Sequence, residues 1–142
     1  MSVGFKTRRM VQFVDTDMAG IAHFTNYLRY LEEAEHEFLR SVDLSVVMYD
    51  DRGSYGFPKM SVQCDYKQPV RHEQWLDIEL EISTDDDKSI DYRGQFFLDG
   101  KLVAKGAIKV ACCRFPPNDF PYPIPIPDHI LKVLKPEMSS TS

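Results

Sequence analysis

Apolar residues recur at three- and four-residue spacing between residues 24 and 41, which predicts a long amphipathic helix. Its apolar stripe is broad and rich in aromatic side chains, and consists of Phe24, Tyr27, Leu28, Leu31, Ala34, Phe38 and Val42. Charged residues occupy the opposite face, where Arg29 and Glu33 are four residues apart and can pair. A stripe of this width needs a large apolar surface on which to pack.

Alternation of apolar and polar residues marks much of the remaining chain and predicts β-strands. One strand, at residues 5–14, precedes the helix. Four more follow it, at residues 60–67, 76–83, 90–98 and 102–113. Between the last two, Asp99-Gly100 is a two-residue hairpin signal that suits a type I′ turn. We therefore expect the strands after the helix to form an antiparallel meander.

Two segments interrupt this pattern. Residues 43–56 predict a connection with one short helix at 45–49, because glycine and proline punctuate its end. The tail of the chain is rich in proline, which cannot join a β-ladder, so the sheet is expected to stop near Arg114. A last short helix is predicted at 128–134, capped by Asp128, and the final Ser and Thr residues are expected to be disordered.

The predicted elements fit one architecture best. One long helix and about five antiparallel strands, each with an apolar face, bury those faces when the sheet wraps around the helix in an α+β domain. We expect this domain to cover residues 1–115 and a proline-rich extension, 116–142, to pack on or near it. The other face of the sheet is charged but also apolar in places, which favours contact with a second subunit. Its apolar residues are Phe97, Val103, Ala107 and Ala111.

Composition and charge narrow the function classes. The chain has 142 residues, 43% of them hydrophobic, which suits one domain with a substantial core. A formal net charge of −5 argues against a nucleic-acid partner, which needs a basic surface. No apolar run approaches the roughly 20 residues that span a bilayer, and the amino-terminal residues lack the apolar core of a signal peptide. We therefore expect a cytoplasmic protein without a membrane partner.

Cysteine usage points away from disulfides and zinc. Cys64, Cys112 and Cys113 are odd in number, and the two adjacent cysteines are poorly placed to bridge. No Cys-x-x-Cys spacing is present, so neither a disulfide scaffold nor a zinc site is predicted.

The stretch between the first strand and the helix carries the candidate chemistry. Residues 11–27 read Val-Gln-Phe-Val-Asp-Thr-Asp-Met-Ala-Gly-Ile-Ala-His-Phe-Thr-Asn-Tyr. An apolar strand ends there, two aspartates follow one residue apart, and a glycine turn leads into the helix. The first N–H groups of a helix are unpaired and lie at the positive end of its dipole, so a side chain that faces them is well placed for catalysis.

This stretch resembles the signature of the 4-hydroxybenzoyl-CoA thioesterase-like branch of hotdog-fold acyl-CoA thioesterases. The residues that match it are Asp15, Thr16, Asp17, Gly20, Ile21, Phe24, Asn26 and Tyr27. The order of predicted elements over residues 5–114 agrees with that fold. One departure concerns histidine: many bacterial members have it at the position of Phe24, whereas here it is His23, one residue earlier.

The resemblance implies a hotdog fold and the hydrolysis of a small to medium acyl-CoA thioester to the free acid and CoA, without a cofactor or metal. It implies that Asp17 is the catalytic carboxylate and that the backbone N–H near Phe24 polarises the thioester carbonyl. The expected oxyanion and substrate-binding set also contains Gly20, His23, Asn26 and Tyr27. A homodimer or homotetramer is expected, with the active site near a subunit interface.

The chemistry of thioester hydrolysis is compatible with these residues. The reaction needs a nucleophile or a water activator, and a donor for the negative charge that develops on the carbonyl oxygen. Asp17 can act as nucleophile or as general base, and the sequence leaves both open. Asp15 is expected to be structural, accepting N–H groups of the turn, and two aspartates alone are weak evidence for a metal. His23 could orient substrate or be an ordinary surface histidine.

Two alternative functions stay open at this stage. A hydratase or dehydratase on the same fold would act on the acyl chain, and His23 is the one residue that favours it. A non-catalytic module would bind acyl-CoA or acyl-carrier protein without turnover. The absence of a Gly-x-Ser-x-Gly sequence argues against an α/β-hydrolase triad.

Substrate contacts are predicted only in outline. The acyl pocket is expected to be apolar or aromatic, with Phe24, Tyr27, Phe57 and Met60 in its lining. The CoA phosphates require cations, which an acidic protein must supply locally. The candidates on or near strands are Lys59, Lys67, Arg71, Arg93, Lys105, Lys109 and Arg114.

Overall fold

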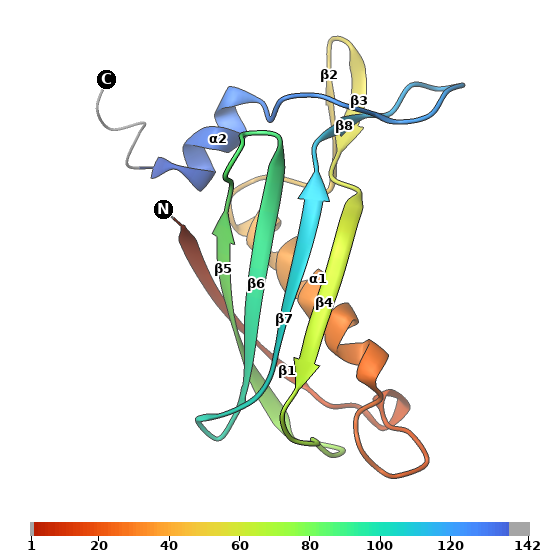
Figure 1. Cartoon of the computed structure of the whole chain (residues 1–142), viewed down its shortest axis with the longest axis vertical. Coiled ribbons are helices and arrows are strands. Elements are labelled where there is room, and N and C mark those ends of the chain that lie inside the picture. Colours follow the sequence, from red (N-terminus) through yellow and green to blue (C-terminus); the bar gives the residue numbers. More distant parts are fainter. Residues whose placement is uncertain (1, 137–142) are drawn as a thin grey trace.

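A curled antiparallel sheet packs against one long helix in the computed structural model, which describes residues 2–136 (Figure 1). Helix α1 (Phe24–Ser41) coincides with the predicted helix, and the sheet has the strand order β1-β5-β6-β7-β4. Its strands are β1 (Val3–Met10), β4 (Lys59–Tyr66), β5 (Trp75–Ser83), β6 (Ser89–Leu98) and β7 (Lys101–Ala111). The predicted α+β class is confirmed.

The apolar stripe of α1 meets the sheet at a pair of glycines. Gly94 of β6 and Gly106 of β7 lie opposite each other, and Leu31 of α1, which is 1% exposed, packs against both. A Cβ at Gly94 would lie 2.3 Å from Leu31 Cδ2, and a Cβ at Gly106 would lie 2.7 Å from Leu31 Cδ1. The glycines therefore let the helix approach the middle of the sheet, where side chains on both strands would hold it away.

A second, small sheet lies at the end of the molecule away from the start of α1 (Figure 1). It has the order β2-β3-β8-β9, with β2 (Val47–Asp50), β3 (Gly53–Gly56), β8 (Cys113–Arg114) and β9 (Tyr122–Pro123). The short helix predicted at residues 45–49 is wrong. The segment forms the β2–β3 hairpin instead, because β3 finds a long-range partner in β8.

The expectation that the proline-rich tail cannot join a ladder is also wrong. Pro123 of β9 lies opposite Cys113 of β8, and the next residue, Ile124, donates its N–H to the Cys112 carbonyl at 2.9 Å. Strand β9 is at the edge of its sheet, where the missing N–H of a proline need not face a partner strand.

The end of the described chain packs onto the same core. Ile130 and Leu134 of helix α2 (Asp128–Leu134) are buried in the main hydrophobic cluster, and Lys135 forms an ion pair with Asp87. The predicted helix is confirmed, but its predicted cap, Asp128, is wrong: Pro127 is the N-cap, and Asp128 is already in the first turn. The domain division at residue 115 stays a prediction, and the disorder expected at the end of the chain concerns residues 137–142, outside the described part.

Two turns decide where the strands near them end. The first strand stops at Met10 rather than at residue 14, because Phe13–Asp15 forms a short 3₁₀ helix. At the β6–β7 hairpin, Asp99 and Gly100 have φ angles of 50° and 81°, the left-handed values that a type I′ turn requires.

Neither helix in residues 2–136 is both long and apolar enough to cross a bilayer. The cytoplasmic location stays a prediction.

The close contact of Leu31 with the two glycines generates the first test. Gly94→Ala should lower the free energy of unfolding by about 1–3 kcal/mol, since the methyl group overpacks the core. Leu31→Ala should cost about 2–5 kcal/mol. The double variant should lose less free energy of unfolding than the sum of the two single losses, because the truncated side chain at residue 31 leaves room for the methyl group.

Urea unfolding at one protein concentration measures all three variants. Gly4→Ala is the matched control, because a Cβ there would lie 3.9 Å from its nearest neighbour, in ordinary contact. Wild-type stability of Gly94→Ala would contradict the packing described here.

Candidate active site

The loop between β1 and α1 is folded into a small hairpin that carries Asp17. Thr16 pairs with Ala22 across it, the Asp17 N–H donates to the Ile21 carbonyl at 2.9 Å, and the Gly20 N–H donates to the Asp17 carbonyl at 2.9 Å. Gly20 has a φ of +80°, which glycine adopts without strain. The predicted glycine turn therefore fixes the backbone on both sides of Asp17.

The Asp17 carboxylate has one oxygen held and one available. Oδ1 accepts a hydrogen bond from the Ala19 N–H at 2.9 Å, and within residues 2–136 no donor reaches the other oxygen. The side chain lies at a cleft of about 430 Å³. The cleft is lined by Asp17, Ile21, Ala22, Phe24, Tyr27, Tyr66, Lys67, Gln68 and Pro69.

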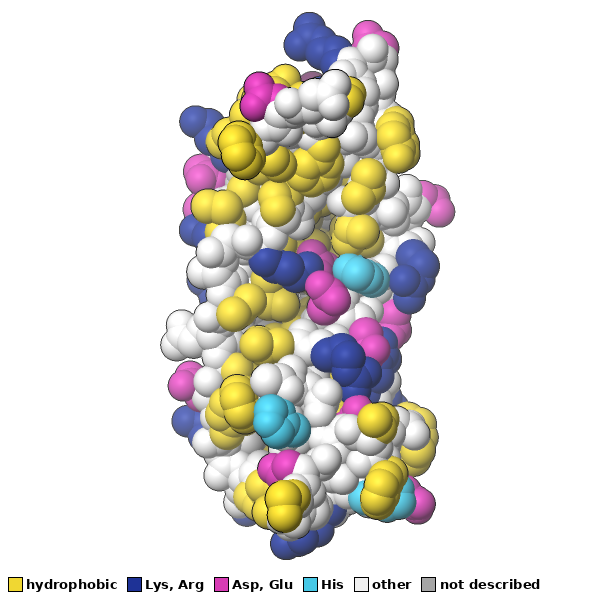
Figure 2. Space-filling view, turned by 90° about the vertical axis from the view of Figure 1, so that its right-hand side faces the viewer, with side chains coloured by type: hydrophobic (Ala, Val, Ile, Leu, Met, Phe, Trp, Pro, Cys, Tyr) yellow, Lys and Arg dark blue, Asp and Glu magenta, His cyan; other side chains and the backbone are white. Residues whose placement is uncertain are grey.

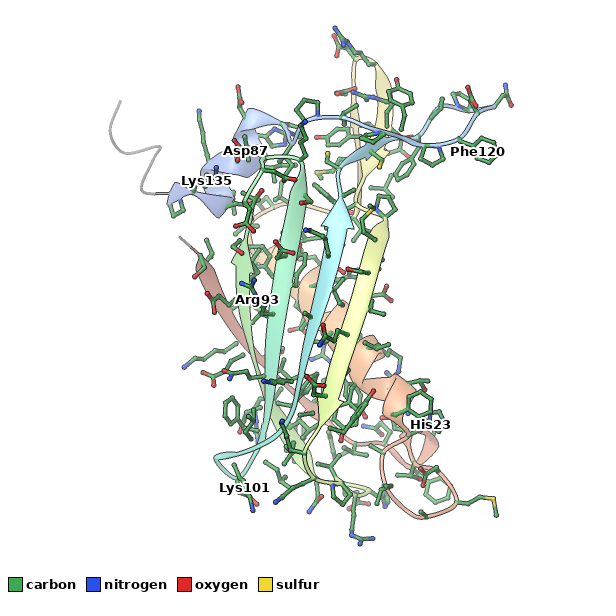
Figure 3. The ribbon with its side chains drawn as sticks, in the orientation of Figure 1. His23, Asp87, Arg93, Lys101, Phe120 and Lys135 are labelled. Atoms are coloured by element: carbon green, nitrogen blue, oxygen red, sulfur yellow. The ribbon has the colours of Figure 1, made fainter. Side chains whose placement is uncertain are left out.

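The start of α1 forms the other side of this cleft. His23 is the N-cap: its Nδ1 accepts from the Thr25 N–H at 3.3 Å, and its ring lies 4.5 Å from the Phe24 ring, centroid to centroid. Figure 3 shows His23 at this end of the helix, far from the Asp87–Lys135 ion pair. No acceptor for the Phe24 N–H is found in the described part of the chain, so this group can donate to a ligand.

Asp15 and Asn26 are not part of the cleft lining and hold the loop instead. Asp15 is 2% exposed, and its carboxylate accepts hydrogen bonds from the Gln12 N–H at 2.9 Å and the Tyr30 hydroxyl at 2.7 Å. The Asn26 side-chain amide donates to the Asp15 carbonyl oxygen at 2.7 Å. Asp15 therefore accepts a turn N–H as expected, but also binds the helix.

Aromatic rings enclose the inner part of the cleft. Tyr27 is 2% exposed and packs edge-on against Tyr66 and Phe96, with centroids 5.1 and 5.3 Å away. The Tyr66 hydroxyl donates to the Phe24 carbonyl oxygen at 2.8 Å, which ties the end of β4 to the start of α1. Burial, with a smaller contribution from Cys64, raises the pKa of Tyr27 to about 12. Its phenol is therefore neutral across the physiological range.

Two of the predicted phosphate-binding cations are held in ion pairs with carboxylates. Lys59 pairs with Glu35 and Glu32 at 2.8 and 3.2 Å, and Arg114 binds Asp50 at 2.7 Å. Lys67 alone among the candidates lines the Asp17 cleft. In residues 2–136 no cluster of three or more His, Cys, Asp or Glu side chains could hold a metal ion.

The chain matches a known protein family over most of its length. The model of the Thioesterase-like superfamily matches residues 11–134, nearly the whole described chain. The chain belongs to this superfamily. The resemblance and the hotdog fold expected from the sequence are thereby confirmed, as is the prediction of a thioester hydrolase.

Individual members of the superfamily align with this chain over most of their length. A 1,4-dihydroxy-2-naphthoyl-CoA hydrolase from Parasynechococcus marenigrum is 32% identical over 111 residues, 73% of each chain. The acyl-CoA thioesterase YbgC from Haemophilus influenzae is 25% identical over 132 residues, 91% of this chain and 97% of that protein. The crystal structure of protein AQ1494 from Aquifex aeolicus has a TM-score of 0.81 at 32% identity, covering 92% of this chain and 99% of that one.

Sequence reasoning found part of the cleft of this superfamily member. Asp17, Phe24 and Tyr27 line the cleft, whereas Gly20, His23 and Asn26 shape the loop and helix start around it. Phe57 and Met60, expected in the lining, do not reach it. Phe57 is buried elsewhere, and Met60 is 65% exposed next to a β-bulge in β4.

Tyr66, Gln68 and Pro69 of the lining were missed, and Lys67 was expected only as one of several candidate cations for the CoA phosphates. Tyr66 ends an alternating strand, but its spacing along the chain gives no sign that the strand end reaches the start of α1. That contact depends on β4 being the outer neighbour of β7, which no local pattern reveals.

The raised pKa of Tyr27 predicts how stability changes with alkaline pH. Unfolded Tyr27 ionises near the ordinary pKa of about 10, whereas the folded phenol ionises only at about 12. Above the lower value the unfolded state loses its proton first. The free energy of unfolding should therefore fall as pH rises from about 10 to about 12, and Tyr27→Phe should reduce that slope.

Denaturant midpoints measured at several pH values in this window test the slope, with Tyr49→Phe, at a site that is 78% exposed, as the matched control. An unchanged slope in Tyr27→Phe would contradict the assignment.

Proposed function

We propose that Asp17 hydrolyses an acyl-CoA thioester whose carbonyl oxygen is held by the Phe24 N–H. One observation carries the proposal: a carboxylate oxygen and a helix-start N–H, both without a partner in the described residues, belong to the same cleft. The N–H lies at the positive end of the α1 dipole, where it stabilises negative charge on the oxygen of the tetrahedral intermediate. The intermediate then expels the CoA thiolate.

Two routes to that intermediate use the same atoms. The free oxygen of Asp17 can take a proton from water as the water attacks, or it can attack the carbonyl itself and form an anhydride that water opens. A single turnover in ¹⁸O-water separates them. If Asp17 attacks the thioester and water then opens the anhydride at the Asp17 carbonyl, the first product acid carries no label and ¹⁸O enters the Asp17 carboxylate, whereas direct water attack labels the acid and leaves Asp17 unlabelled.

The acyl group is best matched by an aromatic one. Phe24, Tyr27 and Tyr66 present ring faces and edges in a cleft of about 430 Å³, and such rings pack favourably on an aryl group. The similarity to a 1,4-dihydroxy-2-naphthoyl-CoA hydrolase supports the same choice. Lys67, at the same cleft, is positioned to meet a phosphate of CoA.

We also propose that the protein works as a homo-oligomer paired through β4. This edge strand is exposed on both faces and has no partner on its outer side in the described structure. Met60, Val62 and Tyr66 are 65%, 51% and 45% exposed, and Met18 of the loop and Phe24 of the cleft are exposed as well. Figure 2 looks onto this side, where hydrophobic side chains lie above and below a charged band. A second copy would cover the edge and close the cleft.

The hydratase alternative is less well supported, because the one residue that favours it, His23, caps α1 and lies beside the Phe24 ring. Loss of an enoyl absorbance without thiol release would restore it. A binding module without activity would show no thiol release at all.

Asp17→Asn tests the catalytic role. The change should lower kcat for thiol release about 10²–10⁴-fold or more, as expected for loss of a general base or nucleophile. The fold should be kept, since the Asn oxygen can still accept from the Ala19 N–H. Thiol release from benzoyl-CoA and naphthoyl-CoA measures the effect. Asp99→Asn, in the β6–β7 turn, is the charge-matched control, and near wild-type turnover of Asp17→Asn would rule Asp17 out.

Val62→Lys tests the proposed pairing. Two copies of the strand related by a two-fold axis would bring like charges together, so the variant should be monomeric and release less thiol. Light scattering coupled to size exclusion gives the mass. Val47→Lys on β2, at a site that is 44% exposed, should keep the wild-type mass. A monomeric wild-type protein would contradict the proposal.

A further inference from the structure

Asp15 is the point at which the catalytic loop and helix α1 are joined. Its side chain is almost completely buried and receives three kinds of donor: the Gln12 N–H at 2.9 Å, the Tyr30 hydroxyl at 2.7 Å and the Arg29 guanidinium. Gln12 lies at the start of the loop, whereas Tyr30 and Arg29 belong to α1. The carboxylate therefore links the start of the loop that carries Asp17 to α1.

The backbone of Asp15 makes a second connection to the same helix. Its carbonyl oxygen accepts from the His23 N–H at 2.8 Å and from the Asn26 side-chain amide at 2.7 Å. The loop that follows Asp15 therefore returns to the Asp15 carbonyl at His23, the N-cap of α1. Asp17 and the Phe24 N–H both lie next to this closed junction, so their relative position depends on it.

Neighbouring charges compensate the buried Asp15 carboxylate. Burial and the hydrogen bond to Asp15 raise the pKa of Tyr30, so its phenol stays a donor. Burial alone would lower the pKa of Arg29, but Asp15 and Glu33 raise it. Arg9 then joins Glu33 at 2.8 Å and also pairs with Glu37. A chain of alternating charges therefore connects the junction to β1 and compensates the buried carboxylate.

A substrate in the Asp17 cleft does not touch Asp15. Asp15 is not among the residues that line that cleft, and lines a separate one of about 580 Å³ together with Arg29, Tyr30 and Glu33. Any effect of Asp15 on the reaction must therefore pass through the loop.

We propose that Asp15 is a positioning residue, which holds Asp17 and the Phe24 N–H in register for the reaction through its bonds to Tyr30 and Arg29. The proposal rests on the proposed function, because it presupposes Asp17 as the reacting carboxylate. Misplacing a reacting group by about 1 Å can cost about 10²-fold in rate, so the junction affects kcat. KM for the acyl-CoA is unaffected, since the lining of the cleft is unchanged.

Tyr30→Phe and Asp15→Asn test this role with benzoyl-CoA as substrate. Each should lower kcat about tenfold or more at unchanged KM. Tyr30→Phe removes one hydroxyl and keeps the ring, so it isolates the hydrogen bond even if Asp15→Asn fails to fold. Arg29→Met should lower kcat as well, and Arg29→Lys, which keeps the charge beside Asp15, should retain more activity than Arg29→Met. Circular dichroism and a measurement of the concentration of active protein show whether a lower kcat reflects loss of folded enzyme.

Asp77→Asn, which breaks the exposed ion pair with Arg8, is the matched control and should leave kcat unchanged. Asp17→Asn is measured in parallel. If Asp17→Asn is inactive while Tyr30→Phe keeps full kcat, the positioning role is wrong and the proposed function stands. A rise of KM at constant kcat would also overturn the positioning role. If Asp17→Asn keeps its turnover, the proposed function fails, and the positioning role with it.

Discussion

The contact between Leu31 and the glycine pair at the centre of the sheet determines where everything else in this fold can lie. Because neither Gly94 nor Gly106 has a side chain, α1 lies close against β6 and β7. That closeness fixes the helix start beside the end of β4, where the Tyr66 hydroxyl meets the Phe24 carbonyl. The cleft is therefore a consequence of core packing. Its two walls are elements that the core has already placed.

The two aspartates of the loop lie in opposite environments. Asp15 is withdrawn from water and is stable there because Arg29, Tyr30 and Gln12 supply donors and positive charge. Asp17 stands at the cleft, with one oxygen used to hold its own turn and the other left for chemistry. A short 3₁₀ turn that ends at Asp15 separates these environments within two residues.

Local signals in the sequence were sufficient for the parts of the fold that are locally determined. The period of the apolar residues predicted α1 to the residue and four strands closely, and Asp99-Gly100 predicted its turn. The failures share a cause. The β2–β3 hairpin, β9 with its proline and the Tyr66 wall all depend on partners distant in the chain. Within the site, the roles expected of Asp17 and Phe24 came from the resemblance, because spacing alone favours a turn cap over a catalytic role for Asp17.

The exposure of the cleft bears on how such a minimal site can be effective. A carboxylate and one backbone N–H act strongly only where water is excluded, because a high dielectric weakens both. In a single chain Phe24 is 60% exposed, so the cleft remains wet. The same side of the molecule carries the unpaired edge of β4 and its apolar residues. Pairing along β4 would thus cover the exposed strand edge and also exclude water from the cleft. Assembly and catalysis would then depend on the same surface.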